Sequence, residues 1–485
     1  MLGVGLTYSA AIEPLLDRCP DLFDVLEIEP QTLWTRASGQ TPRFRVEEAV
    51  LDHLEGLPGR KLIHSVGTPV GGTVAPDPAQ LELLAAMVER FQSPWLSDHL
   101  SYNQTPEFAT GFFLPPRQTV EGVRVVTRSI SLLQEALRVP VLVETGVNYL
   151  RPRPDEIPDG QFVAAAVERA NCGLLLDMHN VFTNALNGRQ PIDEFIDSLP
   201  LERVLEIHLA GGMELDGFWL DSHSGEIPEP LVAICERVIP RLPNLSAIVF
   251  EIFPSFVQLV GLDLVQAQIE RLRELWSRRN EAVDPAPPPL TLRLETASGG
   301  GAMAPEVWER ALGSLVIGQG ESACDDLGLQ DDPAISLVQG LIHEFRASMI
   351  VGVLRLTSRL LMLGLGPEAF RTILTSYWLA TPPQMYASLE ADAFARHLEG
   401  LDLRVPHLTQ VLHFEEAVTA TLSDGQTRIV EFEFEPLPLL RALAEGRLPD
   451  EPPQPGRFEI ELTPAGPTAA VGLDVEDVQT AFPYH

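Results

Sequence analysis

The first 280 residues alternate short apolar segments with longer segments of helical periodicity, and this pattern limits the possible folds more than any other feature. Alternating strand and helix signals are typical of βα units and a parallel sheet. Eight units in this length match a (β/α)8 TIM barrel, the α/β fold that we predict. A doubly wound sheet is the alternative, but no Gly-rich GxGxxG turn follows the first segment. The expected strands are 3–7, 25–28, 61–65, 96–100, 139–144, 173–177, 204–208 and 247–252.

A proline-rich segment separates this region from the rest of the chain. Residues 284–289 (Asp-Pro-Ala-Pro-Pro-Pro) can continue neither a helix nor a central strand. We therefore predict two domains, at residues 1–283 and 290–485. The second is expected to be mainly helical and to end in a small β element at 428–435 and 457–462, where apolar and acidic residues alternate. Its expected helices are 304–316, 335–363, 366–377, 388–398 and 408–420.

Composition narrows the possible partners. The formal net charge of −34 argues against nucleic acid, because a phosphate backbone requires a basic surface. The four cysteines are far apart and form no CxxC pair, which fits a reducing cytoplasm. The N-terminal residues read as a strand rather than a signal peptide, and no apolar stretch is long enough to span a bilayer. We expect a cytoplasmic protein without a membrane partner.

Six consecutive expected strands, the third to the eighth, each carry a His, Asp or Glu at the carboxyl end. In a (β/α)8 barrel these ends converge on one face. Several imidazoles and carboxylates in one pocket are costly to bury unless cations neutralise the acids. Nitrogen and oxygen ligands without thiolate favour iron, manganese or zinc, and the set exceeds what one ion needs, so we expect two or more ions bridged by Glu144 or Asp177. The strand-end residues are His64, His99, Glu144, Asp177, His208 and Glu251, and a loop adds Asp221 and His223.

Several positions remain open on sequence grounds alone. A single His or acid at a strand end is more often structural than a ligand, so the prediction depends on the whole set. Asp98 and His99 point to opposite sides of a strand, and we assign His99 to the centre. His179 could ligate a metal, form a hydrogen bond or face a loop. Glu27 and Glu29 could equally line the barrel or face solvent.

In this order the residues resemble the multinuclear non-heme iron-dependent oxidative enzymes, the family that includes the oxidase subunit of methanobactin biosynthesis. The likeness covers most of residues 1–280. It implies two or three iron ions (Fe2+ and Fe3+), O2 as co-substrate and a ribosomally synthesised precursor peptide as substrate, with cysteine the commonest target. Members usually have asparagine where this chain has His179, and a second acid where it has Ser224. The matching segments are 3–6, 64–67, 97–100, 143–144, 174–177, 207–211 and 221–223, with Glu251.

The resemblance also implies roles for individual residues. The implied metal ligands are His64, His99, Glu144, Asp177, Asn180, His208, Asp221, His223 and Glu251. The implied catalytic residues are the four at the centre of the set, His99, Glu144, Asp177 and His208.

The second domain resembles the partner subunit that accompanies these oxidases. The likeness lies in residues 345–348, 366–371 and 406–408, with Phe414 and Glu415. In relatives this subunit is usually a separate chain that binds the leader of the precursor peptide. The chain would then be a fusion of oxidase and partner that needs no separate partner subunit. We expect the leader to add as an extra strand to 428–435 or 457–462.

Two other functions are compatible with parts of the sequence. A divalent-metal sugar isomerase or epimerase would also place acids and imidazoles at barrel strand ends. It would hold one or two Mn or Mg ions without using O2, and would need a lysine or a paired acid and base near the metals. No lysine stands at an expected carboxyl strand end. The third hypothesis is a metal-stabilised binding protein in which the C-terminal domain performs the function.

Overall fold

The computed structural model describes residues 1–36, 43–280, 303–319, 328–329 and 331–471. The chain divides into two compact units, each made of several segments. The expected proline connector at 284–289 and the boundary at residue 283 lie outside the described residues. The first unit comprises Met1–Leu33, Glu47–Pro106 and Phe113–Val338, and the second comprises Trp34–Val46, Glu107–Phe112 and Gln339–His485.

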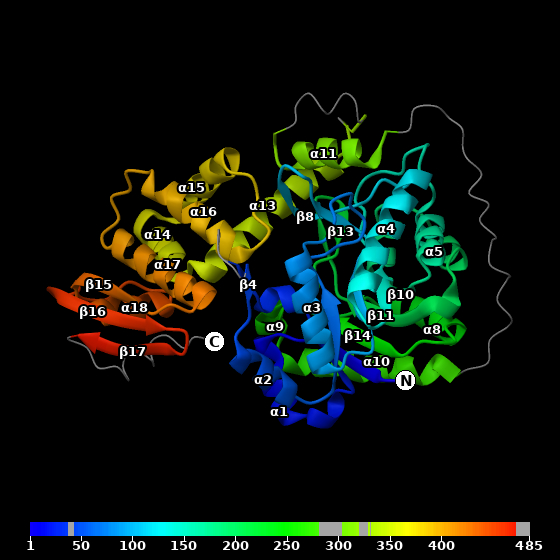
Figure 1. Ribbon diagram of the computed structural model, residues 1–485, viewed down its shortest axis with the longest axis horizontal. Coiled ribbons are helices and arrows are strands. Elements are labelled where there is room, and N and C mark those ends of the chain that lie inside the picture. The colour runs from blue at the N-terminus through cyan, green and yellow to red at the C-terminus, as the bar shows by residue number, and fades with distance from the viewer. Residues whose placement is uncertain (37–42, 281–302, 320–327, 330, 472–485) are drawn as a thin grey trace. The chain divides into compact units, whose positions relative to one another are not determined.

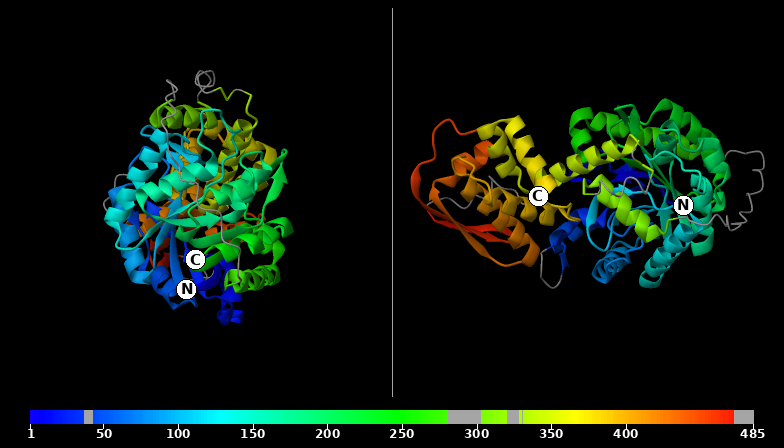
Figure 2. Two further views of the ribbon diagram at one scale, coloured as in Figure 1. Left: turned by 90° about the vertical axis from the view of Figure 1, so that its right-hand side faces the viewer. Right: turned by 90° about the horizontal axis from the view of Figure 1, so that it is seen from above.

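The first unit contains a closed barrel of eight parallel strands, surrounded by helices (Figure 1, Figure 2). The predicted barrel is thereby confirmed. Nearly every strand residue is buried, as expected for parallel strands covered on both faces. In their order around the barrel the strands are β1 (Gly3–Thr7), β14 (Ala247–Glu251), β11 (Val204–Ala210), β10 (Gly173–Asp177), β9 (Val141–Glu144), β6 (Leu96–His99), β5 (Arg60–Ser65) and β2 (Val25–Ile28).

Several barrel helices begin where the sequence supplies a capping side chain. Asp77 accepts a hydrogen bond from the Ala79 amide (3.0 Å), and Thr119 accepts one from the Gly122 amide (3.2 Å). Such caps satisfy amides that the first turn leaves unpaired. The α-helices of this unit are α1 (Glu13–Arg18), α2 (Glu48–Gly56), α3 (Pro78–Phe91), α4 (Val120–Ala136), α5 (Asp159–Ala170), α6 (Met178–Leu186), α7 (Ile192–Asp197), α8 (Glu229–Val238), α9 (Pro254–Val260), α10 (Leu262–Ser277) and α11 (Pro305–Val316).

Helix α11 packs within the first unit, so the structural division differs from the sequence-based one. The buried Trp308 indole donates to the Pro115 carbonyl (3.4 Å), and the Arg117 guanidinium lies 4.9 Å from the centre of its ring. Glu309 is also buried and accepts a hydrogen bond from the Thr73 amide (3.0 Å). These contacts bind residues 305–316, which the sequence assigned to the second domain, to loops of the barrel.

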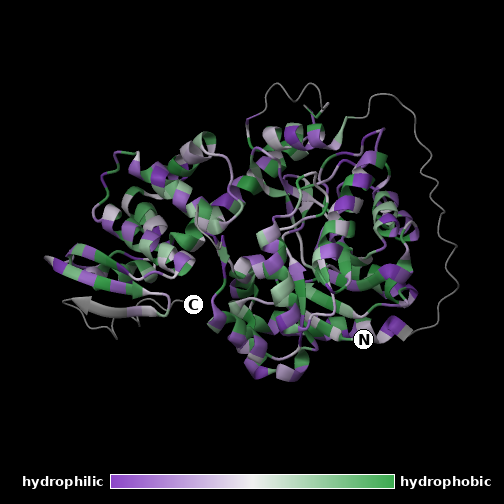
Figure 3. Cartoon of the chain, viewed as in Figure 1, coloured by the Kyte–Doolittle hydropathy of each residue, from purple (hydrophilic) through white to green (hydrophobic). Residues whose placement is uncertain are grey.

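The second unit is mainly helical and has a small antiparallel sheet, as predicted. Hydrophilic and hydrophobic residues alternate along β15 (Figure 3), and its inward residues Val430, Phe432 and Phe434 join the buried core. Its elements are β3 (Thr35–Arg36), β4 (Phe44–Arg45), α13 (Ala334–Val353, which begins in the first unit), α14 (Arg355–Leu365), α15 (Pro367–Ala380), α16 (Ala387–Glu399), α17 (Leu408–Asp424), β15 (Arg428–Phe434), α18 (Pro436–Ala444), β16 (Pro455–Thr463) and β17 (Gly466–Val471).

Two predictions for this unit were wrong in detail. The single helix expected at 335–363 is two helices, α13 and α14, bent by 107°. Glu415 stabilises the break, because its carboxylate accepts hydrogen bonds from the amides of Leu356 (2.7 Å) and Thr357 (2.8 Å) at the start of α14. Residues 457–462 lie in β16, the central strand, which pairs on both sides and has no edge for an added peptide.

Among the described residues, no single helix is long and apolar enough to cross a bilayer, and only the bent pair α13–α14 meets that test when both helices are counted together.

Candidate metal centre

Six barrel strands deliver the candidate ligands to one end of the barrel. Parallel strands all leave the barrel on the same side, so residues at their carboxyl ends converge. The side chain of His99 is 16% exposed, and the other five are at most 6% exposed. The residues and their strands are His64 (β5), His99 (β6), Glu144 (β9), Asp177 (β10), His208 (β11) and Glu251 (β14).

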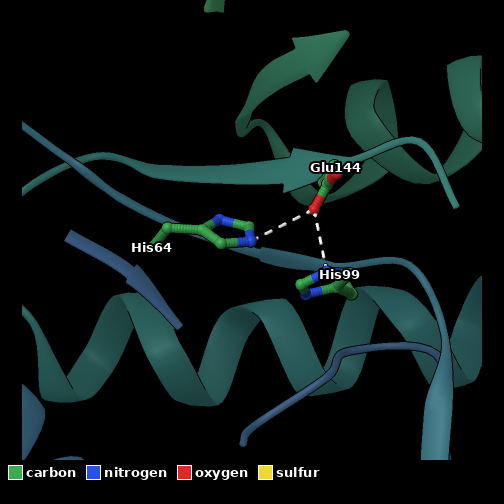
Figure 4. Close-up of side chains that lie close together, drawn as sticks. All are labelled: His64, His99 and Glu144. Carbon is green, nitrogen blue, oxygen red and sulfur yellow. Dashed lines mark ion pairs between the residues drawn. The ribbon is translucent and has the colours of Figure 1, made fainter. Parts of the chain in front are cut away.

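The first group of donors is centred on Glu144. Its Oε2 lies 3.3 Å from His64 Nε2 and 3.2 Å from His99 Nε2. Figure 4 shows both imidazoles directed at this carboxylate. One donor atom from each of the three residues lies within 4.8 Å of the others. Two nitrogens and one oxygen at this spacing suit iron, manganese or zinc.

A second group shares Glu144 with the first. It adds donor atoms of Asp177, His208 and Glu251, again within 4.8 Å of one another. His208 Nδ1 lies 3.2 Å from Glu251 Oε1 and 3.8 Å from Glu144 Oε1. Glu144 directs Oε2 toward the first group and Oε1 toward the second, so it could serve both if each group held an ion. The sequence left Glu144 and Asp177 as alternative bridges, and the geometry favours Glu144.

Two loop residues extend the cluster beyond the strand ends. Asp221 and His223 follow β13 (Phe218–Leu220), and His223 Nε2 lies 3.0 Å from Asp221 Oδ1 and 3.6 Å from Glu251 Oε2. His223 has a φ of 44°, a strained conformation for a residue other than glycine, and its ring packs 4.7 Å from that of Phe253. The loop therefore holds the imidazole next to the second group at some conformational cost.

The start of α6 positions the two remaining candidates. Asp177 Oδ1 accepts a hydrogen bond from the Asn180 amide (2.8 Å) and caps the helix, while Asn180 Nδ2 donates to the Thr145 carbonyl (3.1 Å). These bonds leave Asp177 Oδ2 and Asn180 Oδ1 buried and without a hydrogen-bond partner in the described part of the chain. Both oxygens are therefore available as ligands.

Neighbouring side chains determine which nitrogen of each imidazole faces the cluster. His64 Nδ1 lies 2.9 Å from Ser97 Oγ, so Nε2 faces the first group. His208 Nε2 lies 3.2 Å from each oxygen of Glu27, so Nδ1 faces the second group. A partner that occupies one ring nitrogen fixes the tautomer and leaves the other nitrogen to ligate.

Sequence reasoning left Glu27 open and overlooked Glu206 and Trp95. Glu27 (β2) and Glu206 (β11) are fully buried inside the barrel, and Glu206 Oε2 accepts a hydrogen bond from the Trp95 indole (2.8 Å). The available signal was the segment Val-Leu-Glu-Ile, which occurs at both 25–28 and 204–207. A carboxylate within a buried apolar strand is rare unless it is paired.

Burial and mutual contact disturb the protonation of the carboxylates. Burial raises the pKa of Glu144 well above its ordinary value, despite the attraction of His99 and His208. Burial and Glu251 raise the pKa of Asp177 to about 7. For Glu251 itself, burial alone would raise the pKa, but His208 and other imidazoles outweigh it and bring the pKa to about 2. Bound cations would displace the protons that these groups otherwise share.

The imidazoles fall into two kinds. Burial and the neighbouring His99 and His208 hold the pKa of His64 well below its ordinary value, so it is neutral and can ligate at pH 7. Burial alone would also lower the pKa of His99, but Glu144 outweighs it and raises the pKa to about 9. Binding of a cation by His99 must therefore release a proton near neutral pH.

The donors fit a cluster of transition-metal ions. Four oxygens in the site, from three carboxylates and one amide, are buried and have no hydrogen-bond partner among the described residues. Such atoms are costly to bury unless something compensates them. They are Glu144 Oε2, Asp177 Oδ2, Asn180 Oδ1 and Glu251 Oε2, of which Glu144 Oε2 and Glu251 Oε2 lie within ion-pair distance of imidazoles.

A small apolar hollow lies near the candidate ligands, and two of its lining residues contact His99 and Asp221. Phe113 of β8 (Ala109–Leu114) lines it and stacks on the His99 ring, with the ring centres 4.3 Å apart. Tyr149 also lines it, and its hydroxyl accepts a hydrogen bond from the Asp221 amide (3.1 Å). Leu312 of α11 closes another side. In this structure the lining leaves room for little more than one water-sized group.

The closed barrel and its strand-end His, Asp and Glu residues define a (β/α)8 protein with a candidate multinuclear metal centre. The sequence profile of a family described as the RiPP precursor modification enzyme MbnB/TglH/ChrH matches residues 1–262. This match covers more than half of the 485 residues, and the chain belongs to that family.

The chain is also similar to individual proteins. The chain is 30% identical over 231 residues to a UPF0276 protein of Streptomyces avermitilis, spanning 46% of this chain and about half (47%) of the relative. It is also 30% identical over 236 residues to a UPF0276 protein of Anaeromyxobacter sp., spanning 48% of this chain and 82% of the relative. A crystal structure of D-psicose 3-epimerase from Clostridium cellulolyticum H10 matches at 12% identity with a TM-score of 0.38, covering 57% of this chain and 97% of that one.

Proposed function

We propose that the protein is a multinuclear non-heme iron enzyme that uses O2 to modify a ribosomally synthesised precursor peptide oxidatively, with cysteine the expected target. The observation that carries the proposal is the Glu144 carboxylate, which is shared by two groups of buried nitrogen and oxygen donors. Membership of a family of precursor-modifying enzymes supports the peptide as substrate.

Two or three ions would be held by overlapping sets of side chains. Iron there would supply electrons for the reduction of O2 and a Lewis acid for a substrate thiolate or carboxylate. The ligands would be His64, His99 and Glu144 for one ion, Glu144, Asp177, His208 and Glu251 for the next, and Asn180, Asp221, His223 and Glu251 for a third.

The apolar lining near the cluster would favour a substrate with an apolar group next to the reacting one. Phe113 covers one face of His99, which excludes water from that side of the first group. A peptide whose target side chain reached the cluster could place a neighbouring apolar group against Phe113, which stacks on His99. Contacts of this kind would hold the target in one orientation during the reaction.

We further propose that the second unit binds the leader of the precursor peptide, so that no separate partner subunit is required. Strand β15 lies at one edge of its sheet, and Ile429 on it is 60% exposed. Glu431 lies opposite Glu459 on β16, and Arg457 pairs with both carboxylates (3.4 and 3.1 Å), which leaves these three groups with a net negative charge. An acidic sheet edge suits an extended leader with basic residues, added as a further antiparallel strand.

Point substitutions test this role better than deletion of residues 284–485, because α11 packs in the first unit. Ile429→Asp should weaken binding of a fluorescent leader peptide by at least about tenfold, the effect of roughly 1.4 kcal/mol. Leu448→Asp makes the same change at another exposed apolar residue of the second unit and should have little effect. Equal affinity in all three proteins would contradict the proposed edge.

The sugar isomerase alternative has less support. Lys61 is the only lysine in the sequence, and it lies at the start of β5, at the end of the barrel opposite the cluster. Its ammonium group donates to the carbonyls of Leu57 (2.5 Å) and Gly59 (2.9 Å). Lysine chemistry at the cluster is therefore not available to this chain.

The decisive experiment is anaerobic purification with metal analysis, followed by O2 exposure with a short peptide encoded next to the gene. We expect iron in the protein and a mass change in the peptide that is lost in His208→Ala and Glu144→Gln. The control His53→Gln alters an exposed imidazole that pairs with Glu13 and should retain the reaction. Stoichiometric zinc in place of iron, or a reaction indifferent to O2, would count against the proposal.

A further inference from the structure

His179, whose role the sequence left open, has a partner at each of its two ring nitrogens. The residue lies in the first turn of α6 and is fully buried. Its Nδ1 lies 3.0 Å from Asp221 Oδ1, and its Nε2 accepts a hydrogen bond from the indole of Trp219 in β13 (3.3 Å). Neither contact could be predicted from the sequence.

The indole partner fixes the tautomer of His179. An indole N–H can only donate, so Nε2 must carry a lone pair and accept. In a neutral imidazole the proton then resides on Nδ1, which donates it to Asp221 Oδ1. One nitrogen is occupied by an indole proton and the other by its own proton, so His179 has no lone pair left for an ion.

The surrounding chain holds Trp219 in place for this contact. Asn187 accepts a hydrogen bond from the Trp219 amide (2.9 Å) and donates one to its carbonyl (2.8 Å). Gly212 leaves room for the pair, since a Cβ there would lie 2.4 Å from Trp219 Nε1 and 2.7 Å from His179 Nε2. Asn187 and Gly212, in two separate segments of the chain, therefore both allow the indole to lie close to the imidazole.

We propose that His179, held by Trp219, is a positioning residue for Asp221 and for the ion that Asp221 and His223 would share. It is not itself a metal ligand. Asp221 Oδ1 lies 3.0 Å from both His179 Nδ1 and His223 Nε2, so the donated proton of His179 sets the direction of the carboxylate toward the outer ion. The inference deepens the proposed metal centre and depends on it.

The chemistry also accounts for histidine at this position. An asparagine side chain carries its amide nitrogen on Cγ, and histidine carries Nδ1 on Cγ. Either residue can therefore donate to Asp221 from the same distance along the side chain. The imidazole adds a second nitrogen that must be satisfied when buried, and Trp219 supplies the donor.

The test compares four variants of the full-length protein by anaerobic Fe2+ titration against a chelator and by Mössbauer spectra of the 57Fe-loaded protein. His179→Leu should weaken one ion by about 10- to 100-fold, as loss of a ligand's hydrogen-bond partner does, and leave the others tight. His179→Asn should restore wild-type affinity and the wild-type spectrum. Trp219→Phe should weaken the same ion, and Trp276→Phe on α10 should weaken none. Thermal melting of the metal-free proteins records whether each variant folds.

Each outcome decides between positioning and ligation. If His179 were a ligand through Nε2, Trp219→Phe would free that nitrogen and tighten the ion. A tighter ion in Trp219→Phe, or loss of the same ion in His179→Asn as in His179→Leu, would overturn the proposal. Unchanged iron binding in both His179→Leu and Trp219→Phe would also overturn it while leaving the metal centre intact. A wild-type protein that takes up no Fe2+ at all would overturn the metal centre and this inference together.

Discussion

Replacement of Glu27 by glutamine should weaken iron binding, although Glu27 is not itself a proposed ligand. Both Glu27 oxygens lie 3.2 Å from His208 Nε2, so the carboxylate accepts the proton of that nitrogen and leaves Nδ1 for the second group. Glutamine is neutral and offers one acceptor where the carboxylate offers two. Loss of such a partner typically costs 10- to 100-fold in metal affinity, about 1.4 to 2.7 kcal/mol. The assay is anaerobic competition with a chromophoric Fe2+ chelator.

Glu206→Gln is the matched control for this prediction. Glu206 is equally buried, lies 3.9 Å from the same His208 nitrogen, and has its pKa raised to about 8 by burial and by Glu27. It is therefore largely protonated at pH 7, and glutamine resembles its acid form. We expect little change in affinity. Equal losses in the two variants would mean that Glu27, Glu206 and His208 themselves hold an ion, and no loss in Glu27→Gln would refute the proposed partner of His208.

Three further predictions concern stability. Burial raises the folded-state pKa of Glu415 to about 7 from 4.5, so folding favours the protonated form. Between pH 4.5 and 7 the free energy of unfolding of the wild type should therefore fall by up to about 3 kcal/mol relative to that of Glu415→Gln. Urea unfolding at both pH values measures this difference. Phe432→Ala should cost about 3 to 5 kcal/mol in the same assay, because the ring is 1% exposed and packs against Phe414 and Phe434. Iron at 100 times its dissociation constant should stabilise the folded protein by about 2.7 kcal/mol per independent site, and a melting temperature unaffected by chelation would contradict this.

The barrel and its strand-end donors could be predicted because their signals are local. An apolar run followed by His, Asp or Glu marks both the strand and its carboxyl end, and the expected 173–177 and 247–252 agree with β10 and β14 to within a residue. Their convergence then follows from the fold alone.

The features that escaped prediction depend on residues distant in sequence. The role of Glu27 requires His208, 181 residues away, on a strand across the barrel. The break before α14 depends on Glu415, which is 59 residues beyond the first amide that it caps, while the expected helix 335–363 contains no proline to mark the break. The partners of His179 likewise come from a loop about 40 residues later.

Each unit is made of several segments of the chain, so a single cut in the gene cannot separate the two units. The chain passes from one unit to the other after Leu33, Val46, Pro106, Phe112 and Val338, so neither unit is encoded by one uninterrupted stretch. Separate expression of two fragments cut near residues 284–289 would leave Trp34–Val46 on the N-terminal fragment and α11 on the other. Such fragments should behave as a split protein, each incomplete until the other is present, rather than as an enzyme and a detachable adaptor.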